Sequence, residues 1–180
     1  MCEQAFSSDG YLIDQSKTGM LPYGNYDSSY NGCGWIAAYN ALKAAGRTIP
    51  YETIRQELQR SLMLGGLLGT NMFYLCWYLG RKGFHLRKAF TLAGAQMVSR
   101  GAVAGIVTYW TGRGIHFAAF TQEQGEVLRF FNAVMGKERH LATMEQFFRE
   151  LVRFPLTFVM ALEPLPRSRA RTARRRLGRG

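Results

Sequence analysis

Apolar residues recur at helical spacing through the first half of the chain. Residues 50–62, for example, carry an apolar residue at every third or fourth position, which indicates a helix with one buried face. Gly46 suits the position after a helix, and Thr70 suits the N-terminal cap of another. After an irregular lead-in with room for one short strand, the pattern predicts helices over residues 34–45, 50–62 and 71–81, a strand over 84–90 and a short helix over 92–99.

The second half of the chain consists mainly of short apolar runs bounded by turn residues, which is the signature of strands. Thr143 and Gln146 form a capping-box pattern that opens a helix ending near Val152. Because most helices precede most strands, the pattern predicts an α+β fold, with an N-terminal helical part packed on a C-terminal antiparallel sheet. The predicted strands cover residues 102–110, 114–120, 126–132 and 155–163.

The composition is that of a globular protein, and its positive charge is concentrated at one end. Hydrophobic residues make up 47% of the 180 residues, enough for one domain with a sizeable core, which we place over residues 1–166. Seven arginines between Arg167 and Arg179 hold most of the net charge of +11. We expect this basic tail, residues 167–180, to be disordered. It could contact nucleic acid or another anionic surface, but it lacks interleaved aromatic residues that would stack on bases.

Three widely spaced cysteines, Cys2, Cys33 and Cys76, argue against a disulfide framework and against a zinc site. We therefore expect no metal and no cofactor. Residues 1–15 lack the basic and apolar regions of a secretory signal, and no apolar run reaches the length of a membrane span. These features predict a cytoplasmic protein, in which a free thiol can persist.

Cys33 stands between two glycines at the predicted start of the first helix. A thiolate there would face unpaired backbone N–H groups and the positive end of the helix dipole, and both lower the pKa of a cysteine. Gly32 and Gly34 would also let a substrate backbone approach closely. A small buried hydrophobic residue is the alternative, as for most free cysteines, and these residues alone leave both possibilities open.

His116 lies inside a predicted strand that a tight turn joins to the next one. A three-residue loop at 123–125, with Gly125 in a left-handed conformation, would place Asn132 directly opposite His116. The amide oxygen of Asn132 could then accept the imidazole N–H and fix its tautomer. Cys33, His116 and Asn132 would supply a nucleophile, a base and an orienting group, which is the arrangement of covalent catalysis.

With these residues the sequence resembles the papain-like cysteine peptidases, and particularly the bacterial branch that includes the bacteriocin-processing, double-glycine leader peptidases. The likeness covers residues 22–163. It implies a papain-like fold, a thiolate–imidazolium pair of Cys33 and His116, and a peptide or protein substrate. The matching residues are NGCGWIAA (31–38), Gly69-Thr70, Gly83-Phe84, GIHF (114–117) and Phe131-Asn132.

The sequence departs from this family at the oxyanion site. The family usually has a glutamine about six residues before the nucleophile, where this chain has Asp27, which cannot donate a hydrogen bond when ionised. Asn31 or Asn25 could replace it, together with the backbone N–H of Cys33. We therefore predict a cysteine peptidase or amide hydrolase. The alternative is a catalytically impaired papain-like fold that binds a peptide without cutting it.

Overall fold

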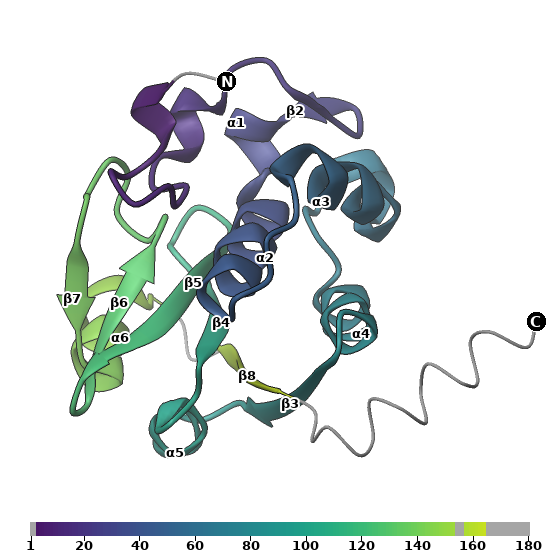
Figure 1. Cartoon of the computed structure of the whole chain (residues 1–180). Coiled ribbons are helices and arrows are strands. Elements are labelled where there is room, and N and C mark those ends of the chain that lie inside the picture. The colour runs from purple at the N-terminus through teal and green to yellow at the C-terminus, as the bar shows by residue number, and fades with distance from the viewer. Residues whose placement is uncertain (1–2, 154–156, 165–180) are drawn as a thin grey trace, which may run out of the picture.

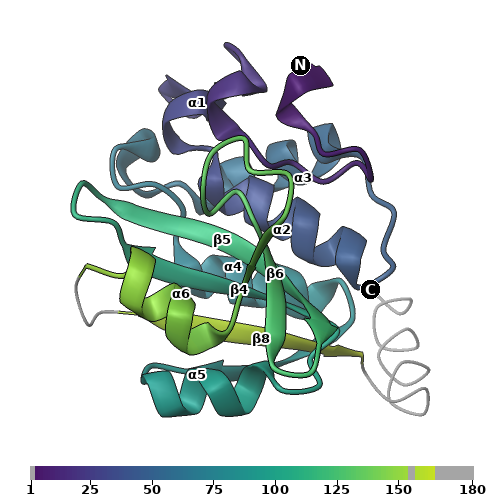
Figure 2. The same cartoon turned by 90° about the vertical axis from the view of Figure 1, so that its left-hand side faces the viewer.

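A six-stranded antiparallel sheet forms the centre of the structure, with helices on both of its faces (Figures 1 and 2). This computed structural model describes residues 3–153 and 157–164. The strands follow the order β3-β8-β4-β5-β6-β7, so the last strand of the chain lies between the first two of the sheet. A separate two-stranded sheet pairs β1 with β2.

The helices and strands have the following bounds. The α-helices are α1 (Ser28–Asn31), α2 (Cys33–Ala44), α3 (Tyr51–Leu58), α4 (Met72–Arg81), α5 (Leu92–Ser99) and α6 (Met144–Leu151). The 3-10 helices are η1 (Glu3–Ala5), η2 (Gln15–Thr18), η3 (Gln59–Ser61) and η4 (Met63–Gly66). The strands are β1 (Pro22–Tyr23), β2 (Tyr26–Asp27), β3 (Phe84–Ala89), β4 (Ala104–Trp110), β5 (Ile115–Gln124), β6 (Val127–Phe131), β7 (His140–Ala142) and β8 (Phe158–Pro164).

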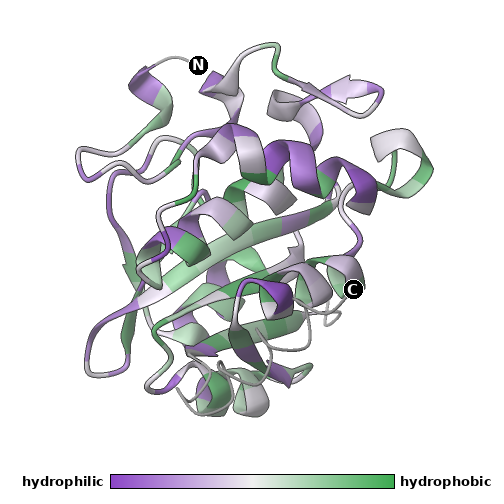
Figure 3. Cartoon of the chain, turned by 45° about the vertical axis from the view of Figure 1, so that its right-hand side comes forward, coloured by the Kyte–Doolittle hydropathy of each residue, from purple (hydrophilic) through white to green (hydrophobic). Residues whose placement is uncertain are grey.

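The central strands are buried on both faces, which explains why they are almost continuously apolar (Figure 3). Successive side chains of a strand point to opposite faces. Ile106 and Phe117 accordingly join the core beneath α2, α3 and α4, whereas Val107 and Ala118 join a second core beneath α5 and α6. The buried Trp35 of α2 belongs to the first core, so the helix that begins at Cys33 is held against the sheet by apolar packing.

The predicted α+β class is confirmed, and most predicted elements agree with the structure within a few residues. The capping box of α6 is present: Thr143 and Gln146 bond reciprocally to each other's backbone. Gly46 has the left-handed conformation expected after a helix, with φ 76°. The strand predicted over 155–163 begins at Phe158, since Thr157 is outside it, and residues 154–156 lie outside the described residues. The basic tail, 167–180, also lies outside the described residues.

Two predictions about the helical part were wrong. Asn71, and not Thr70, caps α4, since its side-chain oxygen accepts the backbone N–H groups of Phe73 and Tyr74. The lead-in before Cys33 is less irregular than predicted, because it contains η1, η2, α1 and the β1–β2 pair. In the described parts of the chain, no helix has both the length and the apolar character that crossing a membrane requires.

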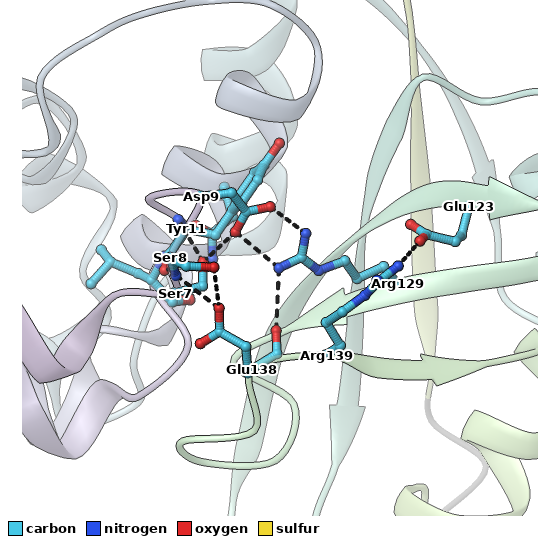
Figure 4. A network of polar contacts seen from close by, with 10 residues as sticks. Ser7, Ser8, Asp9, Tyr11, Glu123, Arg129, Glu138 and Arg139 are labelled. Atoms are coloured by element: carbon cyan, nitrogen blue, oxygen red, sulfur yellow. Dashed lines mark hydrogen bonds and ion pairs between the residues drawn. The ribbon is translucent and has the colours of Figure 1, made fainter.

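The N-terminal segment, residues 3–18, is fastened to the rest of the protein by polar contacts. The buried amide of Asn40 on α2 accepts the backbone N–H of Leu12 at 2.9 Å and donates to its carbonyl at 2.7 Å. On the sheet side, Arg129 of β6 forms an ion pair with Asp9, and Glu138 accepts hydrogen bonds from Ser8 (Figure 4). The segment is therefore held by both α2 and the β6–β7 region.

The two glycines beside Cys33 are required by the packing of the protein itself. A Cβ on Gly34 would lie 2.1 Å from the hydroxyl oxygen of Thr70 and 2.5 Å from its Cβ. Thr70 is 3% exposed and has no room to withdraw. A Cβ on Gly32 would lie 2.4 Å from the carbonyl oxygen of Ser28. Close approach of a substrate backbone is therefore not needed to explain them.

We predict that Gly34→Ala lowers the free energy of unfolding by about 1–3 kcal/mol, because the added methyl overpacks the contact with Thr70. Gly80→Ala is the matched control, since Gly80 lies in α4 with nothing within 4 Å of an added Cβ. It should raise stability by about 0.5–1 kcal/mol. Urea denaturation of both variants measures the difference, and equal effects would contradict the packing explanation.

Candidate active site

Cys33 opens helix α2 at the floor of a cleft. A turn at Gly32 separates α1 from α2, so the first N–H groups of α2 lie beside the sulfur. The Cys33 side chain is 6% exposed. The cleft has a volume of about 520 Å³, and both Cys33 and His116 line it. The structure thus brings together the two residues that the sequence predicted as nucleophile and base.

His116 lies on β5, one residue before Phe117, whose backbone N–H reaches the Cys33 sulfur. Its Nε2 lies 2.6 Å from the backbone carbonyl oxygen of Asn132. A carbonyl oxygen can only accept a hydrogen bond, so Nε2 carries the proton in the neutral ring. Nδ1 is then the basic nitrogen. The ring of Tyr109 packs edge-on against His116, with centroids 5.7 Å apart, and restricts its orientation.

Asn132 contacts His116 in a different way from the one predicted. The observed register pairs Ala119 with Phe131, two residues away from the predicted alignment, because the turn lies at residues 125–126, with Gln124 opposite Val127, and not at 123–125. Asn132 follows the end of β6 with φ 57°, a left-handed conformation that asparagine tolerates better than most residues. Its backbone carbonyl, and not its side-chain amide, therefore accepts the hydrogen bond from His116.

The side chain of Asn132 bonds Gln15, a residue that sequence reasoning missed. Its amide oxygen accepts the Gln15 backbone N–H at 3.0 Å, and its amide nitrogen donates to the Gln15 side-chain oxygen at 3.3 Å. Gln15 and Asn132 are 7% and 3% exposed. Nothing in the local sequence indicates this pair, because its members are far apart in the chain and Gln15 belongs to no periodic element.

Burial controls the charge state of the two reactive side chains. It raises the pKa of the Cys33 thiol to about 11, although the backbone N–H groups of Phe117, Gly34 and Cys33 oppose the shift. Burial also lowers the pKa of the His116 imidazole, against the stabilising effect of the Asn132 carbonyl on the charged ring. The predicted lowering of the cysteine pKa at the helix start is therefore outweighed, and the free protein holds a neutral thiol beside a neutral imidazole.

Of the two side chains predicted to donate to an oxyanion, Asn31 lies in the cleft and Asn25 does not. Asn31 lines the cleft, but its amide nitrogen already donates to the carbonyls of Tyr23 and Gly66, at 3.1 and 3.4 Å. Asn25 is absent from the cleft walls, and its amide packs against Gly65. Asp27 caps α1 by accepting the backbone N–H of Tyr30. The backbone N–H groups at the start of α2 are therefore the best-placed donors.

Two loops form the rims of the cleft. One follows η4 and presents the exposed Leu67 and Leu68, and it is shaped by left-handed residues that include Leu64. The other is the β4–β5 turn with Trp110 and Ile115, which are also exposed. The LGGLLG segment is visible in the sequence as a helix break, but its place opposite the β4–β5 turn depends on the tertiary fold.

The other two histidines, His85 and His140, lie outside the cleft. His140 is 4% exposed and packs against Phe130 and Phe147 in the second core. His85 is exposed and lies beside Glu163. Among residues 3–153 and 157–164, no group of three His, Cys, Asp or Glu side chains could hold a metal ion.

Comparisons with known proteins agree with this fold. No protein-family model matches the sequence, and the search of curated proteins found no match. The solved structures that are similar include the following two. The peptidase domain of Streptococcus ComA, a bi-functional ABC transporter involved in a quorum-sensing pathway, has a TM-score of 0.53 and 16% identity, over 75% of this chain and 93% of that chain. A double-glycine-motif protease from an AMS/PCAT transporter, in complex with the leader peptide, has a TM-score of 0.51 and 16% identity, over 73% and 84%.

At 16% identity, the similarity to these two structures shows the fold alone. The chain has the papain-like α+β fold of the peptidase domains of double-glycine transporters, as the resemblance in sequence predicted.

We predict that the Cys33 thiol ionises with a midpoint near pH 11, because the buried sulfur loses its proton only well above the ordinary value of 9.0. The difference in ultraviolet thiolate absorbance between the wild type and Cys33→Ala measures this midpoint. In urea the same difference should move down to the ordinary value, since burial is lost. A thiolate signal that is already present at neutral pH and disappears in His116→Ala would instead show a preformed ion pair.

Proposed function

We propose that this protein is a cysteine peptidase or amide hydrolase in which Cys33 is the nucleophile and His116 the general acid and base. The observation that carries the proposal is the presence of both side chains in the wall of one cleft, although they come from different layers of the fold. The peptidase folds of the two similar structures support it. Asn132 orients His116 in this proposal through its backbone carbonyl.

The neutral resting pair favours a mechanism in which proton transfer accompanies attack. The thiol proton moves to Nδ1 of His116 while the sulfur forms a bond to the substrate carbonyl carbon. The backbone N–H groups of Cys33 and Gly34 stabilise the oxyanion. The C–N bond then breaks, and the leaving amine takes the proton from Nδ1. His116 next removes a proton from water, which attacks the thioester and releases the acid and the restored thiol.

The cleft favours a peptide with small residues at the cleaved bond. Cys33 is only 6% exposed, so bulky side chains beside the reacting carbonyl would prevent its approach. The apolar rims formed by Leu67, Leu68, Trp110 and Ile115 can hold apolar side chains further from that bond. The similar AMS/PCAT protease is a double-glycine-motif enzyme bound to a leader peptide, so a peptide with a Gly-Gly cleavage motif is the first substrate to test. A cytoplasmic, bacterial setting stays a prediction.

A second candidate function is a peptide-binding module that does not cut. The raised pKa of the Cys33 thiol favours it, and so does the engagement of the Asn31 amide by two backbone carbonyls, which leaves the cleft without its expected side-chain oxyanion donor. Loss of one such donor typically costs about 10²–10³-fold in rate. This module would use the same cleft and the same class of partner.

Cleavage of a peptide library that includes Gly-Gly motifs separates the two functions. We predict that the wild type cleaves, that Cys33→Ala does not, and that His116→Ala is slower by about 10²–10⁴-fold, because the proton-transfer group is lost. His85→Ala is the matched histidine control and should retain the wild-type rate, since His85 is exposed and outside the cleft.

Undiminished cleavage by Cys33→Ala would refute the hydrolase. If no variant cleaves but wild type and Cys33→Ala bind a library peptide equally well, the binding module is the better description. Binding can be measured by fluorescence anisotropy with the same peptides.

A further inference from the structure

Gln15 lies between the two halves of the candidate site and bonds both. Its side-chain nitrogen donates to the carbonyl of Ser29 at 3.1 Å. Ser29 belongs to α1, the short helix that leads directly into Cys33. The side-chain oxygen and the backbone N–H of Gln15 both bond the Asn132 amide. One buried residue thus connects the segment before the nucleophile to the residue whose carbonyl holds His116.

The hydrogen bonds between Gln15 and Asn132 help to set the direction of the backbone carbonyl of Asn132. Asn132 has φ 57°, and the rotation of the backbone at this residue decides where its carbonyl oxygen points. The two hydrogen bonds to Gln15 fix the amide of Asn132 and oppose rotation of the residue out of the left-handed conformation. The 2.6 Å contact with Nε2 of His116 depends on that direction.

Gln15 is itself held in place from both sides. Leu12 is bonded to the Asn40 amide of α2, and the carbonyl of Ile13 accepts the backbone N–H of Gly136 in the loop after β6 at 3.1 Å. The ion pair between Asp9 and Arg129 fixes the preceding turn (Figure 4). The N-terminal segment therefore presents the Gln15 amide from a rigid frame, which a positioning group requires.

We propose that Gln15 is a positioning residue for the Cys33–His116 pair. It sets the ring of His116, through the Asn132 carbonyl, relative to the α1–α2 junction that carries Cys33. The effect that we expect on the reaction rate rests on the proposed function. Gln15 does not line the cleft, so it acts through its neighbours and touches no substrate.

The test compares Gln15→Met with Gln4→Met. Methionine has nearly the length of glutamine and removes both side-chain hydrogen bonds, and Gln4 is an exposed residue of the same segment. The first readout is the ¹⁵N NMR spectrum of the His116 ring. In the wild type and in Gln4→Met, it should show the proton on Nε2. Gln15→Met should show a mixture of tautomers, because only the hydrogen bond from the residue-15 backbone N–H then holds the Asn132 amide, and the side-chain bond that completes its fixation is lost.

The second readout is the rate at which a small activated ester acylates Cys33, followed by mass spectrometry. Gln15→Met should lower this rate by about tenfold or more, since small misplacement of reacting groups costs up to about 10²-fold. Asn132→Gly, which can still adopt the left-handed conformation but lacks the amide that fixes it, should have a similar effect. The variant that combines Gln15→Met with Asn132→Gly should be no slower than the slower of the two single variants, because both substitutions break the same connection between residues 15 and 132.

The two readouts separate the inference from the proposed function. An unchanged His116 tautomer in a folded Gln15→Met protein would overturn the inference, whatever the kinetics. Failure of the wild type to be acylated would count against the proposed function alone. If Gln15→Met does not fold, Gln15→Glu keeps the acceptor for the Asn132 amide. It should then keep the proton on Nε2, and a wild-type tautomer in Asn132→Gly would overturn the inference.

Discussion

The packing of helix α2 against strand β5 determines everything that follows at the candidate site. Trp35 and its apolar neighbours bury most of α2 in the core that also contains Phe117. Because Cys33 begins this helix and His116 precedes Phe117 on the strand, the same packing places both side chains in one cleft. The local sequence around either residue could not achieve this, since the two belong to different layers.

This arrangement removes the Cys33 sulfur and the His116 ring from water. A helix start lowers the pKa of a cysteine when the sulfur stays hydrated, but the Cys33 sulfur is nearly enclosed, and its pKa rises to about 11. The pKa of the imidazole falls for the same reason. The pair therefore rests uncharged, and the proposed chemistry depends on transferring the proton at the moment of attack. A buried pair of this kind suits a substrate that fills the cleft and excludes water.

Local patterns predicted the fold better than the site. The α+β class, the Thr143 capping box and the helix that begins at Cys33 all follow from residue spacing, because these features depend on neighbours in the chain. The His116–Asn132 contact was predicted for the wrong atom, since the turn lies at residues 125–126 and not at 123–125, which shifts the register of β5 and β6 by two residues. Gln15 could not be predicted, because its partner Asn132 is brought to it only by the folding of the N-terminal segment over the sheet.

The most direct measurement is a crystal structure of the protein with a peptide aldehyde that ends in Gly-Gly. The account predicts a covalent thiohemiacetal on Cys33, its oxygen facing the first N–H groups of α2. Nδ1 of His116 should face the sulfur, while Nε2 stays on the Asn132 carbonyl. An aldehyde bound without a covalent bond, or an imidazole turned away from the sulfur, would contradict the account.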